Sequence, residues 1–182
     1  MISKNMWEKY PSIWKTQSAY MSWVRGGIRR SLWNRHPIKL EFMRSKTMMI
    51  ENTNPRSSKR FPEVKGCKCE LCDGIFKITE CEVDHKTGNH SLKDMDDLRG
   101  FIEAIIEIDF NDLQMVCKEC HKTKSYADKY EITYNEAKAT RMAIAIVNSK
   151  KDKHWLEQRG IIPASAQVKR REQIIKEILN GN

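Results

Sequence analysis

The chain has 182 residues, of which 40% are hydrophobic and 31% charged, and it carries a net charge of +9. This length suits one domain or a small core with appendages. No apolar run approaches the roughly 18 residues that span a bilayer, and the first thirty residues hold no apolar segment of a secretory signal. These features exclude a membrane or secreted protein, and we expect a cytoplasmic one.

The charge is distributed unevenly along the chain. Residues 1–65 hold 14 Lys and Arg against 4 Asp and Glu, residues 66–149 hold 11 against 16, and residues 150–182 hold 8 against 4. Basic flanks attract a polyanion because they release its condensed counterions. An acidic centre repels that polyanion unless its carboxylates hold metal. The pattern favours a nucleic-acid partner over the alternative of charged faces that are merely solvated.

The first predicted element is a helix over residues 17–33. Its apolar residues recur at spacings of three and four, as one face of a helix requires; they are Met21, Val24, Ile28 and Leu32.

A second helix is predicted to start at Pro37, a favoured first-turn residue, and to run toward Ile50. Residues 52–62 are rich in turn formers and positive charge, which is typical of a linker or an extended arm. We interpret residues 1–65 as a basic helical extension with a linker.

Residues 66–130 have a different character, with short β-prone pieces near residues 75–79, 81–83 and 113–116. Between them, Ser91 and Asp94 form a capping-box pattern before an apolar helical stretch. We therefore predict a helix over residues 94–108.

Residues 131–182 are predicted to be helical and basic. Thr133 and Glu136 form a second capping box, which opens a helix that runs to about residue 148. The apolar spacing predicts a last helix near residues 165–179.

The cysteines suggest a metal site. Reducing compartments disfavour disulfides, and two C-x-x-C knuckles separated by 44 residues match the closed tetrahedral coordination of structural zinc. Cys67 and Cys81 lack this spacing, and we interpret them as a spare thiol and a small buried residue. The predicted zinc ligands are Cys69, Cys72, Cys117 and Cys120.

Metal-binding and basic side chains lie beside these knuckles. Asp84 and His85 are consecutive at the end of a predicted strand, and His121 directly follows the second knuckle. Phosphodiester hydrolysis needs a base that works near neutral pH and a cation at the phosphate. The alternatives are that Asp84 and His85 form a turn and that His121 is a zinc ligand.

The order C-x-x-C, Asp-His, Leu-Gln and C-x-x-C-His resembles the HNH endonuclease family over residues 69–124. The resemblance implies an α+β fold with a ββα-metal core that holds one Mg²⁺ or Mn²⁺. It implies that Asp84 and His121 bind this ion and that His85 is the general base. It also implies that Lys122 and Lys124 contact phosphate.

The chain departs from the family pattern at one position. The family usually has Asn just before the Leu-Gln segment, where it braces the loop that carries the base. Here Asp112 fills that position and Asn111 precedes it, so either residue is a candidate for the bracing role.

The basic extensions resemble the DNA-reading parts of bacteriophage homing endonucleases. We expect a metal-dependent endonuclease that cuts double-stranded DNA at a specific site, as a monomer or homodimer, in a bacterial cytoplasm if it is encoded by a phage. The alternatives are a non-catalytic zinc protein that binds nucleic acid and a zinc-organised protein-interaction module. Besides Lys122 and Lys124, the expected DNA-binding residues are Arg25, Arg29, Arg30, Arg35, Lys169, Arg170 and Arg171.

Overall fold

The computed structural model describes residues 5–87 and 91–181. The chain folds into two compact units, Met1–Lys118 and Glu119–Asn182. It combines helices with two small antiparallel sheets, which confirms the α+β class. The predicted domain boundaries after residues 65 and 130 remain predictions. No helix in the described part of the chain is long and apolar enough to cross a membrane.

The first unit begins with three helices, α1 (Met6–Lys9), α2 (Gln17–Ser31) and α3 (Pro37–Ser45). The Thr16 hydroxyl caps α2 by accepting a hydrogen bond from the Ala19 N–H. This helix matches the one predicted over residues 17–33, except that a 3₁₀ turn at Trp33–Arg35 follows it.

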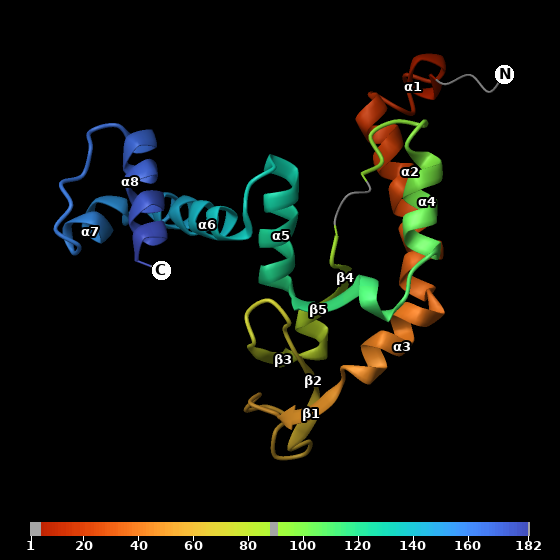
Figure 1. Ribbon diagram of the computed structural model, residues 1–182, viewed down its shortest axis with the longest axis horizontal. Helices are drawn as coiled ribbons and strands as arrows, with labels where there is room; N and C mark the ends of the chain where they lie inside the picture. Colours follow the sequence, from red (N-terminus) through yellow and green to blue (C-terminus); the bar gives the residue numbers. More distant parts are fainter. Residues whose placement is uncertain (1–4, 88–90, 182) are drawn as a thin grey trace. The chain divides into compact units, whose positions relative to one another are not determined.

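Helix α2 lies alongside α4 (Leu98–Ile106) in Figure 1. Their contact is apolar and buries Met21, Leu92, Phe101 and Ile105. Helix α4 is shorter than the predicted helix 94–108, and the predicted capping box at Ser91 was wrong. Instead, the Asp97 carboxylate accepts hydrogen bonds from the N–H groups of Lys93 and Asp94, so it closes a turn before the helix starts.

One sheet contains strands β1 (Met48–Glu51), β2 (Glu63–Lys68) and β3 (Ile75–Lys77) in that order. Strand β1 lies where the second predicted helix was to continue, so that part of the prediction was wrong. Antiparallel pairing with β2 overrides the local pattern. Residues 52–62 close this hairpin and are therefore a loop within the unit rather than a linker.

Strand β2 was not predicted, because charged residues and Gly66 interrupt its alternation. The glycine is required where it stands. A Cβ atom on Gly66 would lie 2.6 Å from Cδ1 of Ile50, so any larger residue would displace the β1 side chain.

The second sheet pairs β4 (Cys81–His85) with β5 (Leu113–Cys117). These strands confirm the predicted β pieces at 81–83 and 113–116, and β3 confirms the start of the piece at 75–79. All five residues of β5 are buried. The core around this sheet contains Phe42, Cys67, Val83, Ile108, Leu113 and Met115.

Helix α5 (Lys118–Tyr130) follows β5 directly, and the second unit begins within its first turn. The other helices of that unit are α6 (Tyr134–Asn148), α7 (Asp152–Glu157) and α8 (Gln167–Asn180). Their buried core contains Ala143, Val147, Leu156 and Ile174.

The predicted capping box of α6 is confirmed. The Thr133 hydroxyl accepts from the Glu136 N–H, and the Glu136 carboxylate accepts from the Thr133 N–H. Helix α8 confirms the last predicted helix to within two residues at each end. Helix α7 was not predicted, because its six residues are too few to show a period.

Candidate metal centre and active site

The first cysteine knuckle forms the tight connection between β2 and β3. The Cys69 N–H donates to the carbonyl oxygen of Gly74, and the Asp73 N–H donates to that of Cys69, both at 2.9 Å. Asp73 has a φ of 58°, a left-handed conformation that Asp adopts more readily than most residues. An ion pair of 2.7 Å between its carboxylate and Lys68 adds a contact across the turn.

The second knuckle is built on the junction of β5 and α5. Cys117 ends the strand, and Cys120 lies three residues later in the first turn of the helix. Two hydrogen bonds join the first knuckle to β5. The Glu70 N–H donates to the carbonyl oxygen of Met115 at 2.8 Å, and the Cys117 N–H donates to Sγ of Cys69 at 3.3 Å.

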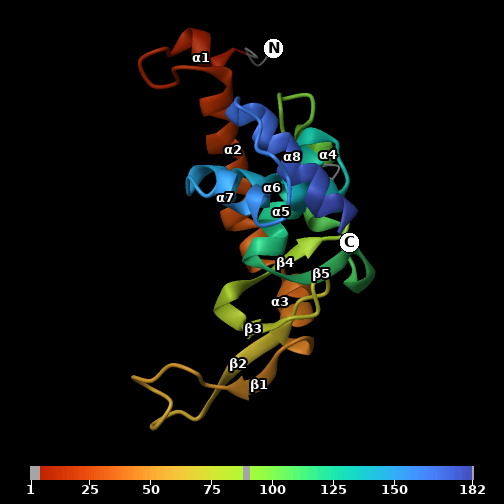
Figure 2. The same cartoon turned by 90° about the vertical axis from the view of Figure 1, so that its left-hand side faces the viewer.

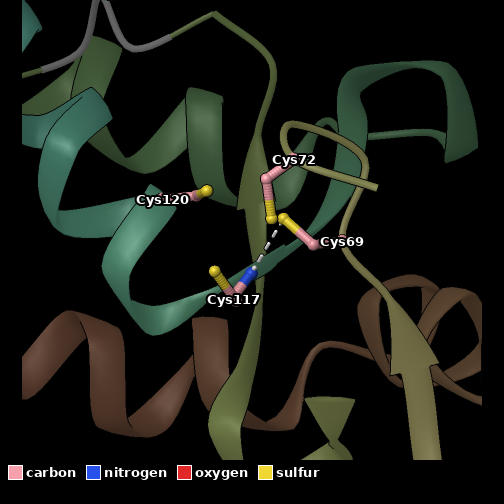
Figure 3. Close-up of side chains that lie close together, drawn as sticks. All are labelled: Cys69, Cys72, Cys117 and Cys120. Atoms are coloured by element: carbon pink, nitrogen blue, oxygen red, sulfur yellow. Dashed lines mark hydrogen bonds between the residues drawn. The ribbon is translucent and has the colours of Figure 1, made fainter. Parts of the chain in front are cut away.

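Four sulfur atoms converge between the knuckles, as Figure 3 shows. The Sγ atoms of Cys69, Cys72, Cys117 and Cys120 all lie within 4.8 Å of one another. Zn–S bonds of about 2.3 Å in a tetrahedron place sulfurs roughly 3.8 Å apart, so this donor set fits zinc. All four cysteines are free of disulfides. The predicted grouping of the four residues is confirmed, and the group can bind a metal ion such as zinc.

The surroundings of Cys69 favour the thiolate that zinc binds. Burial alone would raise the pKa of this thiol. However, hydrogen bonds from the backbone N–H groups of Cys117, Leu71 and Cys72 outweigh burial and lower the pKa to about 7. The thiolate form therefore competes well near neutral pH.

The remaining two cysteines lie outside the sulfur cluster. Cys67 is fully buried against Phe42 and Val83, and Cys81 packs against the same core. Burial raises the pKa of both thiols, and in Cys81 the neighbouring Cys67 raises it further. Both residues therefore stay protonated as small apolar side chains.

Asp84 and His85 form the end of β4, opposite β5. Asp84 pairs with Gln114 across the sheet. The Gln114 side-chain amide, 6% exposed, donates to Oδ2 of Asp84 and to the His85 carbonyl oxygen, each at 3.3 Å. One amide thus holds both the carboxylate and the backbone of the next residue.

The imidazole of His85 is held at its edge and on its face. Nε2 lies 2.9 Å from the carbonyl oxygen of Ala104. Because a carbonyl oxygen can only accept, this hydrogen bond places a proton on Nε2 and makes Nδ1 the basic nitrogen of the neutral ring. The Trp33 ring stacks on the imidazole with centroids 4.4 Å apart, and Nζ of Lys39 lies 4.5 Å from the Trp33 ring centroid.

Asp112 and Asn111 lie in a 3₁₀ turn just before β5. The Asp112 carboxylate accepts a hydrogen bond from the Asp109 N–H, and the Asn111 N–H donates to Asp109. The Asp112 carbonyl oxygen accepts from the Lys86 N–H at 2.8 Å. Asp112 therefore contacts the residue after His85 through its backbone.

His121, Lys122 and Lys124 lie on α5, directly after the second knuckle. Lys122 forms an ion pair of 2.7 Å with Glu119, and Lys124 lies 3.7 Å from the Asp128 carboxylate. These three residues lie within four positions of α5, directly after Cys120.

The predicted DNA-binding residues of the first unit lie on and just after α2. Arg25 donates to the carbonyl oxygen of Leu92 at 2.6 Å, whereas Arg30 and Arg35 are exposed. Burial and the charge of Arg25 lower the pKa of Arg29, while the Asp84 carboxylate raises it. Arg29 thus lies within electrostatic reach of the end of β4.

Helix α8 carries the other three basic residues. Lys169 is exposed and Arg171 half-buried, but Arg170 is only 8% exposed. The Arg170 guanidinium donates to Asp152 and to the carbonyl oxygens of Ala164 and Ser165. These contacts give Arg170 a structural role within the second unit, and we leave it out of the proposed DNA contacts.

Comparison with known proteins finds no matching family model, no matching curated protein and no matching solved structure. Sequence reasoning gave no role to Gln114 and Trp33, which hold Asp84 and His85. A polar residue within an otherwise apolar strand was the available signal for Gln114, whereas nothing local relates Trp33 to a residue 52 positions later.

Proposed function

We propose that this protein is a metal-dependent DNA endonuclease. The observation that carries the proposal is the pair at the end of β4, where a carboxylate and an imidazole are adjacent and separately held. Gln114 fixes Asp84, while the Ala104 carbonyl and the Trp33 ring fix His85. Side chains held in this way suit catalysis, because less ordering remains for the transition state.

His85 is the general base in this proposal. An imidazole accepts protons near neutral pH, and the contact of Nε2 with Ala104 leaves Nδ1 as the nitrogen with a lone pair. Removal of a proton from water by Nδ1 generates the nucleophile that attacks a phosphodiester. The Trp33 stack keeps the ring from rotating away while it gains and loses that proton.

Asp84 and His121 are the proposed ligands of the catalytic Mg²⁺ or Mn²⁺. Such an ion stabilises charge on the phosphate and the leaving oxygen. A carboxylate oxygen suits both metals. Gln114 orients the Asp84 carboxylate, as outer hydrogen bonds commonly do for metal ligands. The zinc bound by the four cysteines is structural and fixes the start of α5, which carries His121.

The basic flanks supply affinity for the phosphate backbone. Residues 1–65 and 150–182 carry the charge excess, and exposed Arg30, Arg35 and Lys169 are free to meet a polyanion. Arg29 is also exposed and adds to this positive charge. The substrate we propose is double-stranded DNA.

A second candidate function is zinc-dependent nucleic-acid binding without catalysis. The hydrogen bond between Gln114 and Asp84 is also one that a purely structural cross-strand pair makes. The two functions differ in whether a divalent ion changes the covalent state of DNA.

The test is cleavage of supercoiled plasmid DNA by zinc-loaded protein, with added Mg²⁺ and without it. We expect cleavage only with the divalent ion and a loss of at least about a hundredfold in Asp84→Ala. Glu157→Ala, an exposed acid of α7, is the matched control and should cleave at the wild-type rate. Bound but intact DNA under every metal condition would favour the non-catalytic function.

A further inference from the structure

The loop at residues 52–62 is ordered by a buried asparagine. Asn52 is 4% exposed, and its Nδ2 donates to the Ser57 hydroxyl at 3.1 Å and to the Phe61 carbonyl at 2.7 Å. Its Oδ1 accepts from the Asn54 N–H, and its backbone N–H donates to the Pro62 carbonyl. One side chain therefore ties together both ends and the middle of the loop.

The backbone between these ties is also hydrogen-bonded. The Asn54 carbonyl accepts from the N–H groups of Ser57 and Ser58, and the Ser57 carbonyl accepts from those of Arg60 and Phe61. Asn54 also accepts from the Arg56 N–H through its side chain. The loop is thus two consecutive turns of defined shape, although it contributes no buried apolar side chain to a core.

The loop presents positive charge alone. Arg56, Lys59 and Arg60 are exposed, and residues 52–62 contain no acid. Within the described part of the chain, no carboxylate forms an ion pair with these three side chains. The acidic residues of the hairpin that flank the loop are Glu51 and Glu63, which face each other at its base.

The hairpin projects from the rest of the first unit, as Figure 2 shows. Strand β3 pairs with β2 only at residues 66–68, so the end of the hairpin toward the loop has two strands. A two-stranded ribbon is narrow enough to approach a DNA groove. The ordered cations therefore lie at the end of a slender, exposed element.

We propose that the β1–β2 hairpin is a preordered DNA-contacting ribbon, in which Arg56, Lys59 and Arg60 bind phosphates of a duplex. The proposal rests on DNA being the substrate, and it adds a contact surface distinct from α2 and α8. Preorder matters because a loop that is already folded loses less conformational entropy on binding. This explains why a buried asparagine with several hydrogen bonds lies in an exposed loop.

The first test compares duplex affinity without added Mg²⁺ or Mn²⁺, where cleavage is absent, at equal zinc content, for the full-length wild type and the variant R56Q/K59Q/R60Q. Each lost phosphate contact lowers the slope of log affinity against log salt by about 0.9, so we expect a decrease of about 2–3. The control K93Q/K129Q/K138Q removes the same charge from exposed lysines of the acidic middle segment and should keep the slope. Equal slopes for the loop variant and the wild type would overturn the proposal.

The second test separates order from charge. Asn52→Ala keeps all three cations but removes the ties of the loop, and we expect about tenfold weaker duplex binding. Zinc content equal to the wild type establishes that the variant is folded, and Asn135→Ala on the exposed face of α6 is the control. Unchanged affinity in folded Asn52→Ala would contradict the preordered ribbon. Plasmid cleavage by the wild type is measured separately. If the wild type cleaves DNA but R56Q/K59Q/R60Q keeps the wild-type dependence of affinity on salt, only this inference is wrong. If the wild type neither binds nor cleaves DNA, the proposed function is wrong.

Discussion

The helices α6–α8 and the strands around the cysteines are stabilised in different ways. The helices enclose a small apolar core with Leu156 and Ile174 fully buried, and the buried Arg170–Asp152 ion pair joins α8 to α7. The first knuckle, by contrast, is a turn between β2 and the three-residue strand β3, held by backbone hydrogen bonds and an exposed ion pair. We therefore expect packing to hold α6–α8 together without a metal ion, and the strands around the cysteines to depend on the proposed zinc.

This difference between the two regions shows which contacts position the candidate active site. A zinc ion bound by the four cysteines would fix both the knuckle turn and the start of α5, and with it the position of the residues that follow the second knuckle. Apolar packing then fixes β4, where Val83 is buried just before the Asp84–His85 pair. The candidate active site thus depends on both kinds of stabilisation.

The largest expected effect is that of removing zinc. Structural zinc contributes roughly 10 kcal/mol or more in small zinc modules, so Cys120→Ser or a strong chelator should unfold the strands around the cysteines. Hydrogen exchange should show β2, β3 and β5 losing protection while α6 and α8 keep theirs. Uniform loss of protection in both regions would show that they are one cooperative unit. Zinc-free protein in which β2, β3 and β5 keep their protection would show that zinc does not stabilise these strands.

The second effect concerns the buried ion pair of the helical region. Asp152→Ala leaves the guanidinium of Arg170 buried without its carboxylate, which costs about 3–5 kcal/mol. Thermal unfolding should show α6–α8 melting earlier, with zinc content unchanged. The exposed ion pair between Arg99 and Glu103 provides the control, because Glu103→Ala should change stability by less than about 1 kcal/mol.

The same pair gives the helical region a dependence on pH. The hydrogen bond from Arg170 lowers the pKa of Asp152 below its usual value. A carboxylate whose pKa is lowered on folding adds stability that is present above the unfolded pKa, near 4, and is lost as the pH falls through the folded value. Stability of α6–α8 should therefore decline below about pH 4 in the wild type and decline less steeply in Asp152→Ala. Parallel pH profiles for the two proteins would contradict this assignment.

The third effect concerns how His85 is held. Trp33→Leu removes the stacked ring but keeps an apolar side chain between the two cores, and we expect cleavage to slow by about ten- to a hundredfold with unchanged DNA affinity. Trp33→Phe should restore most of the rate, because a phenyl ring can also stack. The ¹⁵N shifts of the His85 ring provide a second readout, since loss of the Nε2–H tautomer is expected only in Trp33→Leu. Equal rates for the two variants would make Trp33 a packing residue only.

The smallest effect concerns the start of α6. Thr133→Ala removes the hydroxyl that caps the helix and should cost about 1 kcal/mol of stability in the helical region. A melting profile of the cysteine region that stays unchanged would support the independence of the two regions. A matching shift in both would argue against it.

The two regions also differ in how much the sequence reveals. The capping box at Thr133 and the apolar period of α8 are local signals, and both predictions are confirmed. The four cysteines were found by spacing, because a C-x-x-C turn directs two sulfurs to one ion. Long-range pairing was hidden, because β1 and β2 carry weak local patterns and are separated in the sequence by the loop at residues 52–62.

The candidate active site divides in the same way. Asp84 and His85 were identified because they are adjacent in the sequence and come between the two knuckles. Their supports come from distant segments, since Trp33 precedes His85 by 52 residues and Ala104 follows it by 19. No local period encodes such contacts, so the residues proposed to react were easier to predict than the residues that hold them.

The most direct test of the central claim is the single-turnover rate of DNA cleavage by His85→Ala in Mg²⁺, at equal zinc content and saturating protein. We predict a loss of at least about a hundredfold with duplex affinity within twofold of the wild type, because His85 acts on water rather than on the duplex. His154→Ala, an exposed histidine of α7, should cleave at the wild-type rate. A His85→Ala protein that cleaves as fast as the wild type would contradict the proposed active site.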